Sequence, residues 1–194
     1  MNKGILTATL LLSSVLVVAV AATTVSGASS SASNKPAGPH VPKSGGVVRI
    51  TGYSDNDGPM SSVVVTGVIG DYGKAIRTNS SGSPAAEYNE LDLHLGLGSF
   101  GLNIARLESE LGAAISGHFP TNATTCSGEI VVSGGAPIDS GSGTGAYKGL
   151  SGTLQLTITI NEVESPPRCP DTDTSPFLAQ TVFISGSGKV TLSR

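Results

Sequence analysis

The sequence predicts an all-β protein: a small antiparallel eight-stranded β-barrel with one short helix, preceded by an N-terminal signal peptide. Three observations predict this fold. Apolar and polar residues alternate with a period of two in several segments, most clearly over residues 154–160, where Leu and Ile take the even positions. The 26 glycines fit many tight turns. Only 13% of the residues are charged, which is low for a helical bundle or a disordered chain.

The first 28 residues are interpreted as a cleaved signal peptide. Lys3 precedes an apolar run over residues 5–22, and small residues follow at the spacing that signal peptidase accepts. An uncleaved membrane anchor is the alternative, but Ser and Thr dilute the run and no basic stop-transfer cluster follows it. Residues 29–46 are rich in Ser, Pro and Gly and are interpreted as a flexible linker, and residues 47–194 as one barrel domain. We therefore expect a secreted, extracellular protein.

Two strands are expected at the start of the domain. Residues 47–53 fit a first short strand, and residues 62–69 carry valine and isoleucine on both faces. A strand that is apolar on both faces is either covered by other parts of the chain or faces a neighbouring subunit, so a homo-oligomer stays open. Residues 70–73 are expected to break this strand because they contain two glycines.

The middle of the domain predicts a hairpin and the helix. Residues 91–97 place leucines on one face, and residues 100–104 continue the alternation in a shifted phase, so a hairpin turn or a bulge is expected at Gly98 and Ser99. Over residues 105–115 the apolar period changes to that of a short amphipathic helix. This helix is expected to cover an end or a side of the sheet.

The last third of the chain supplies the remaining strands. These are expected within residues 125–133, 143–160, 177–185 and 189–192. The last two are expected to be joined through the glycines at residues 186–188.

Cys126 and Cys169 are the only cysteines. An even pair in an exported chain predicts one disulfide, with two free thiols as the alternative. Their wide separation is not that of a redox motif, and two cysteines with scattered histidines do not form a zinc site.

Charge and composition exclude several classes of partner and cofactor. A net charge of −3 provides no basic field for a phosphate backbone, so nucleic acid is not expected. The absence of Trp leaves few stacking platforms for sugars. No serine has the flanking glycines of a nucleophile elbow, and Lys148 precedes Gly149, the reverse of a P-loop. We therefore expect no cofactor, no metal, and no membrane partner once the leader has been cleaved.

Two glycine-containing motifs resemble those of a known family. Gly-Asp-Tyr-Gly at residues 70–73 resembles the Gly-Asp-Tyr/Phe-Gly element of plant allene oxide cyclases and dirigent proteins, and Gly-Thr-Gly-Ala-Tyr at residues 143–147 resembles their Gly-Thr-Gly-x-Phe/Tyr element. The resemblance covers about residues 47–192 and implies an eight-stranded antiparallel barrel, often trimeric. In that family the barrel cavity binds apolar intermediates and guides a cyclisation or a radical coupling without a cofactor. Dirigent proteins typically have an arginine before the glycine that here is Gly152, whereas this chain has Ser151, so a proposed cationic catalytic group is missing.

The favoured hypothesis is a secreted barrel that holds a small apolar ligand. The polar residues expected near its mouth or lining are Asp71, Tyr72, Glu87, His94 and Tyr147. Each also has an ordinary structural explanation in a turn, in packing or at the surface.

Two alternatives come from other functional classes. In the first, the protein is a cofactor-independent isomerase or cyclase of the family type, in which Asp71 assists proton transfer or stabilises a cationic intermediate. In the second, it is a cell-surface structural protein held together by strand edges and oligomer contacts. No residue is assigned as catalytic from the sequence.

Overall fold

The computed structural model describes residues 39–41, 44–55, 60–79, 89–116, 119–165 and 177–193. These residues all belong to one compact unit, Pro36–Arg194. The predicted signal peptide over residues 1–28 lies outside the described residues, as do most of the predicted linker, Glu87 and Cys169. Within the described ranges, no helix combines the length and the apolar character needed to cross a membrane.

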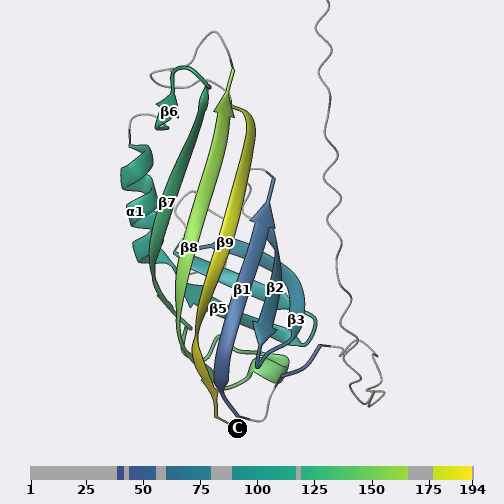
Figure 1. Ribbon diagram of the computed structural model, residues 1–194. Coiled ribbons are helices and arrows are strands. Elements are labelled where there is room, and N and C mark those ends of the chain that lie inside the picture. Colours follow the sequence, from purple (N-terminus) through teal and green to yellow (C-terminus); the bar gives the residue numbers. More distant parts are fainter. Residues whose placement is uncertain are drawn as a thin grey trace, which may run out of the picture. The chain divides into compact units, whose positions relative to one another are not determined.

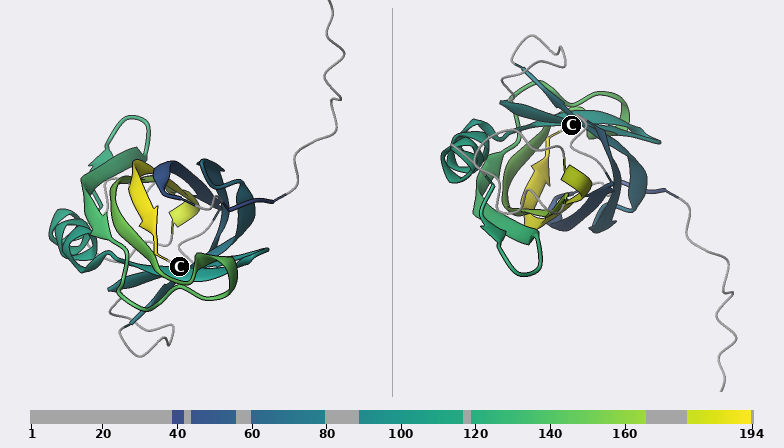
Figure 2. Two further views of the ribbon diagram at one scale, coloured as in Figure 1. Left: turned by 90° about the horizontal axis from the view of Figure 1, so that it is seen from below. Right: turned by 90° about the horizontal axis from the view of Figure 1, so that it is seen from above.

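The described residues form nine strands of a single antiparallel sheet, which curls around an interior (Figures 1 and 2). The order across the sheet is β5-β4-β3-β2-β1-β9-β8-β7-β6. The strands are β1 Gly46–Ser54, β2 Met60–Gly67, β3 Asp71–Thr78, β4 Glu90–Leu95, β5 Gly98–Asn103, β6 Thr121–Asn122, β7 Ser127–Pro137, β8 Leu150–Glu164 and β9 Phe177–Leu192. The predicted all-β class is confirmed, whereas the predicted count of eight strands is one too low and the ladder is open between β5 and β6.

The predicted amphipathic helix is α1, Ala105–Ile115. Its apolar stripe buries Leu107 and Leu111, and the helix packs against β7 (Figure 1). The expectation that it covers a side of the sheet is therefore confirmed.

The predicted break after the valine-rich strand is present but lies a few residues earlier than expected: β2 ends at Gly67, and β3 already begins at Asp71, inside the Gly-Asp-Tyr-Gly motif. One strand prediction is wrong for a physical reason. The glycines at residues 186–188 predict a connection between two strands, but β9 runs through them. A Cβ atom at Gly186 would lie 2.4 Å from Cδ2 of Leu156, so the glycine is needed for close packing across the ladder, not for a turn.

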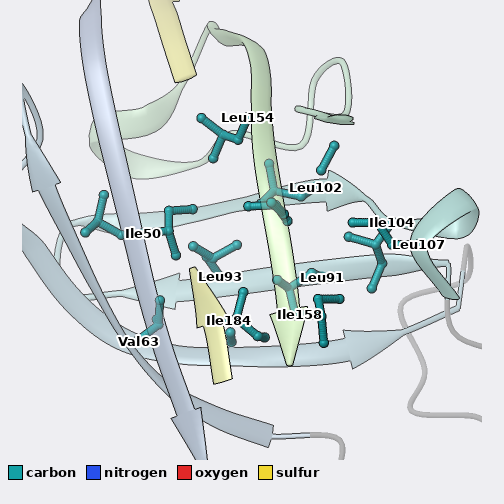
Figure 3. Packing of buried hydrophobic residues seen from close by; sticks show 14 of the residues in the cluster. Ile50, Val63, Leu91, Leu93, Leu102, Ile104, Leu107, Leu154, Ile158 and Ile184 are labelled. Atoms are coloured by element: carbon teal, nitrogen blue, oxygen red, sulfur yellow. The ribbon is translucent and has the colours of Figure 1, made fainter. Parts of the chain in front are cut away.

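Aliphatic side chains fill the interior of the curled sheet (Figure 3). The even-numbered residues of β8 from Leu154 to Ile160 are all buried, as the alternation predicts. Side chains from β1, β4, β5 and α1 meet them; those labelled in Figure 3 include Ile50, Leu91, Leu93, Leu102 and Leu107. Burial of each such side chain stabilises the fold by roughly 1.5–3 kcal/mol.

The predicted disulfide is not supported. Cys126 has a free thiol and lies in the turn before β7, where its backbone φ is +53°. Cys169 lies outside the described residues.

Candidate functional site

Asp71 is a buried carboxylate at the start of β3, with only 4% of its surface exposed. Its Oδ1 accepts hydrogen bonds from the backbone N–H groups of Tyr72 (2.8 Å) and Gly96 (3.2 Å). Its Oδ2 accepts from the N–H of Leu97 (3.0 Å) and from the hydroxyl of Tyr147 (2.5 Å). Four neutral donors among the described residues therefore surround this carboxylate.

The two side chains of this pair have oppositely shifted pKa values. Burial by itself raises the pKa of Asp71, but the hydrogen bonds from Tyr147 and the three N–H groups outweigh it, so the pKa lies below its usual value. Burial, the hydrogen bond to Asp71 and the charge of Asp71 all raise the pKa of Tyr147. At neutral pH the carboxylate is charged and the phenol is neutral, which is unfavourable for proton transfer between them.

Tyr147 is held at this position by the short 3-10 helix Gly145–Tyr147. Gly145 has a φ of +55°, and a Cβ atom there would lie 2.4 Å from the carbonyl oxygen of Leu97. The Tyr147 ring is fully buried and packs against Phe100, with ring centroids 5.3 Å apart. The two motifs that carry the family resemblance are thus in direct contact, through Asp71 and Tyr147.

Residues 138–146, an irregular stretch that leads into the 3-10 helix, lie along the edge of β5. Ile138 forms an isolated bridge with Leu102, and the N–H of Thr144 donates to the carbonyl of Ser99 (2.8 Å). In return, the N–H of Ser99 donates to Oγ1 of Thr144 (3.0 Å). This segment satisfies backbone groups of β5 that a free edge would leave exposed.

The side chains of Tyr72 and His94 are not part of this cluster. Tyr72 is 66% exposed, and His94 is exposed on β4 opposite Lys74. Glu87 lies outside the described residues. Of the five predicted residues, the structure brings together Asp71 and Tyr147, in the structural role that the sequence also allowed.

A group of three carboxylates, from Glu90, Asp92 and Asp139, was not predicted. Burial, followed by the charges of Asp139 and Asp92, raises the pKa of Glu90; burial and the charge of Asp92 raise the pKa of Asp139. Thr78 donates a hydrogen bond to Asp92 (2.9 Å). In the part of the chain that the structure describes, no three His, Cys, Asp or Glu side chains are arranged to hold a metal ion.

A hollow of about 540 Å³ lies where β7, β8 and β9 meet near β6, at the end of the sheet labelled β6 in Figure 1. Gly128, Glu162 and Gln180 line it and are neighbours across the ladder. Most of the other lining residues are polar, including Asn122, Glu129, Asn161 and Thr181.

Glu162 and Gln180 are buried polar side chains, 9% and 7% exposed. Nε2 of Gln180 donates to Oε2 of Glu162 over 2.8 Å. Oε1 of Gln180 is buried and has no hydrogen-bond partner among the described residues. Glu164, two positions further along β8, is also buried and accepts a hydrogen bond from Thr121 (2.6 Å).

The sequence contains a signal for this site. In β8 the even positions that carry Leu and Ile up to Ile160 continue as Glu162 and Glu164, and in β9 Gln180 is in phase with Val182. A polar residue in phase with core positions predicts a buried polar group.

Comparisons with models of protein families, with curated proteins and with solved structures found no match for this chain. The chemistry of the hollow is therefore inferred from its own side chains.

Proposed function

We propose that this protein is a secreted, non-enzymatic binding protein that holds a small molecule in the hollow between β6 and β9. The observation that carries the proposal is the hollow itself. Its volume of about 540 Å³ falls in the range of small-molecule sites. Most of its lining is polar, and Glu129, Asn161 and Thr181, which are neighbours in one row across β7, β8 and β9, can fix the orientation of a ligand.

The state of Asp71 supports binding over catalysis. A general base needs a lone pair directed at the substrate. Both oxygens of Asp71 already accept two hydrogen bonds each, and its partner Tyr147 is fully buried. Ser151, at the position of the family arginine, is exposed and hydrogen-bonded to Thr191. The cyclase alternative therefore has less support.

The proposal keeps the allene oxide cyclase and dirigent type of barrel as its fold. The nine strands form one curled antiparallel sheet, and residues 138–146, which lie along the edge of β5, would close the barrel there. We propose a different ligand position from the barrel interior expected from the sequence. Aliphatic side chains pack against one another there, and an apolar ligand would have to displace them.

Native mass spectrometry of the secreted protein tests the proposal. We expect a co-purifying small molecule in the wild type. Ala179 is exposed and lines the hollow, so Ala179→Trp should fill the hollow and abolish the bound mass. Ala113, exposed on α1, provides the matched control, and Ala113→Trp should keep the bound mass. A wild type without any bound molecule, or an Ala179→Trp variant that retains it, would contradict the proposal.

A second candidate, a structural protein that self-assembles, is favoured by one observation on the outer face of the sheet. Tyr53 and Phe183 are paired across β1 and β9, with ring centroids 5.3 Å apart, and both are exposed. Thr159 continues this row to Val131, which is also exposed, so the four residues from Tyr53 to Val131 carry no charge; in the other direction the row runs through Ser62 to Lys74. Sedimentation velocity tests this candidate: Phe183→Lys should convert an oligomer into a monomer, and a monomeric wild type would exclude it.

A further inference from the structure

We propose that the hollow between β6 and β9 binds a neutral sugar, which extends over the outer face of the sheet towards the ring pair of Tyr53 and Phe183. The inference rests on the proposed function, because it names the ligand class of the same site. It is carried by one row of polar side chains, by the apolar side chains on both sides of that row, and by the charge of the lining.

The polar row consists of Glu129, Asn161 and Thr181, which line the hollow and are paired directly across β7, β8 and β9. Two positions further along β7 and β9 lie Val131 and Phe183, which are both exposed, so the row lies on the same outer face as these residues. Residues paired across a ladder have Cβ atoms about 5 Å apart, so the row spans roughly 10 Å. This length suits a ligand of one or two sugar rings.

The polar groups of this row are available to a ligand. Within the part of the chain that the structure describes, none of the three side chains forms a hydrogen bond or an ion pair. Elsewhere on the same face, Ser133 and Thr157 instead bond each other over 2.8 Å. The carboxylate of Glu129 accepts hydrogen bonds, whereas the amide of Asn161 and the hydroxyl of Thr181 both donate and accept. Neighbouring sugar hydroxyls, which also donate and accept, match this set.

Apolar side chains lie on both sides of the polar row. Val163 and Ala179 are paired with each other, are exposed and line the hollow. On the other side, the exposed ring of Phe183 packs against Tyr53, with ring centroids 5.3 Å apart. A sugar ring has apolar C–H faces and a rim of hydroxyls, so it can cover these side chains while its hydroxyls reach the row. The absence of Trp predicts few platforms of this kind, but the fold builds one from two residues that are distant in the sequence.

The charge of the site favours a neutral ligand over a charged one. Glu129 is the one charged residue of the polar row, and it is exposed, so solvent and salt screen its attraction for a cation. None of the described lining residues is Lys, Arg or His, so an anion would have no partner of opposite charge. A neutral sugar uses the hydrogen-bonding groups of the row without a counter-charge.

NMR titration of the full chain tests the ligand class. The sugar probes are the neutral disaccharides maltose, cellobiose and lactose. The controls are 1,4-diaminobutane, succinate and cyclohexanol, which supply a positive charge, a negative charge and an apolar ring. We expect at least one disaccharide to shift the backbone amide signals of Asn161, Thr181 and Phe183. It should bind at least about tenfold more tightly than each control, because it alone combines several hydroxyls with apolar ring faces.

Matched variants locate the interaction. Asn161→Ala should weaken binding of that disaccharide by about tenfold, since hydrogen bonds to the amide are lost. Phe183→Ala should weaken it by about three- to tenfold, since a ring contact is lost. Gln155→Ala is the control, because Gln155 is an exposed amide on the same face of β8 that does not line the hollow. An equal loss in Gln155→Ala and Asn161→Ala, or binding that survives both Asn161→Ala and Phe183→Ala, would overturn the proposal.

The outcomes also separate this inference from the proposed function. If a control compound binds as tightly as the disaccharides and shifts the same amides, the sugar inference fails while small-molecule binding in the hollow stands. If none of the three disaccharides shifts those amides, the sugar inference fails, and the co-purified mass decides the proposed function independently.

Discussion

The hydroxyl of Tyr147 donates a hydrogen bond of 2.5 Å to Oδ2 of Asp71, a residue 76 positions earlier in the chain. This bond joins the start of β3 to the segment that lies along the edge of β5. It therefore connects the middle of the curled sheet to one of its edges, where the ladder of β5 would otherwise end. Both residues are buried, so the bond contributes more than a surface hydrogen bond would.

Tyr147→Phe should lower the free energy of unfolding by about 1–3 kcal/mol, because Asp71 loses one of its donors while the ring keeps its packing against Phe100. Urea denaturation measures the change. Ligand binding in the hollow should be unaffected, since neither residue lines it. An unchanged free energy of unfolding would show that the bond does not stabilise the fold.

Asp71 should also produce a characteristic acid dependence of stability. Its pKa in the folded state lies below the ordinary value of 3.8, so its contribution is present above pH 3.8 and is lost as the pH falls through the folded pKa. In Asp71→Asn this part of the pH dependence should disappear, and the variant should be less stable than the wild type at pH 7. Thermal unfolding measured between pH 7 and pH 2 tests this; parallel curves for the two proteins would contradict it.

Asp139→Asn should stabilise the protein at pH 7. Oδ2 of Asp139 is buried without a hydrogen-bond partner among the described residues, and burial together with the charge of Asp92 raises the pKa of Asp139. For a carboxyl with a raised folded pKa, stability falls as the pH rises through the interval between the unfolded and the folded pKa. An asparagine side chain carries no charge, so the variant avoids this loss of stability. Its advantage over the wild type should therefore vanish at low pH, where Asp139 is protonated. Asp55→Asn, at an exposed position, is the control and should change little in the same thermal unfolding measurements.

Gly145→Ala should destabilise the fold by at least about 1–3 kcal/mol, because Gly145 has a positive φ and its Cβ would collide with the carbonyl of Leu97. Gly112→Ala provides the contrast. Gly112 lies in α1, and a Cβ atom added there would have no neighbouring atom within 4 Å, so alanine should stabilise the fold by about 0.5–1 kcal/mol. Chemical denaturation of both variants tests the pair, and effects of the same sign would be evidence against this account.

The sequence by itself determined the elements whose signal is local. The period of two predicted β1 and the buried face of β8, and the change of period over residues 105–115 predicted α1 with the observed bounds. These predictions succeed because burial of one face imposes a periodicity on the chain wherever that face packs.

Only the tertiary structure decided which distant residues meet. Glycine at residue 186 is compatible with a turn or with close packing, and the contact with Leu156 on the neighbouring strand selects packing. The alternation shows that Glu162 and Gln180 occupy core-facing positions in their strands. Only the pairing of β8 with β9 puts these two side chains side by side, and it leaves Oε1 of Gln180 without a hydrogen-bond partner among the described residues. The sequence pattern gives the face of each residue, whereas the order and register of the strands give its neighbours, and the chemistry of a site depends on neighbours.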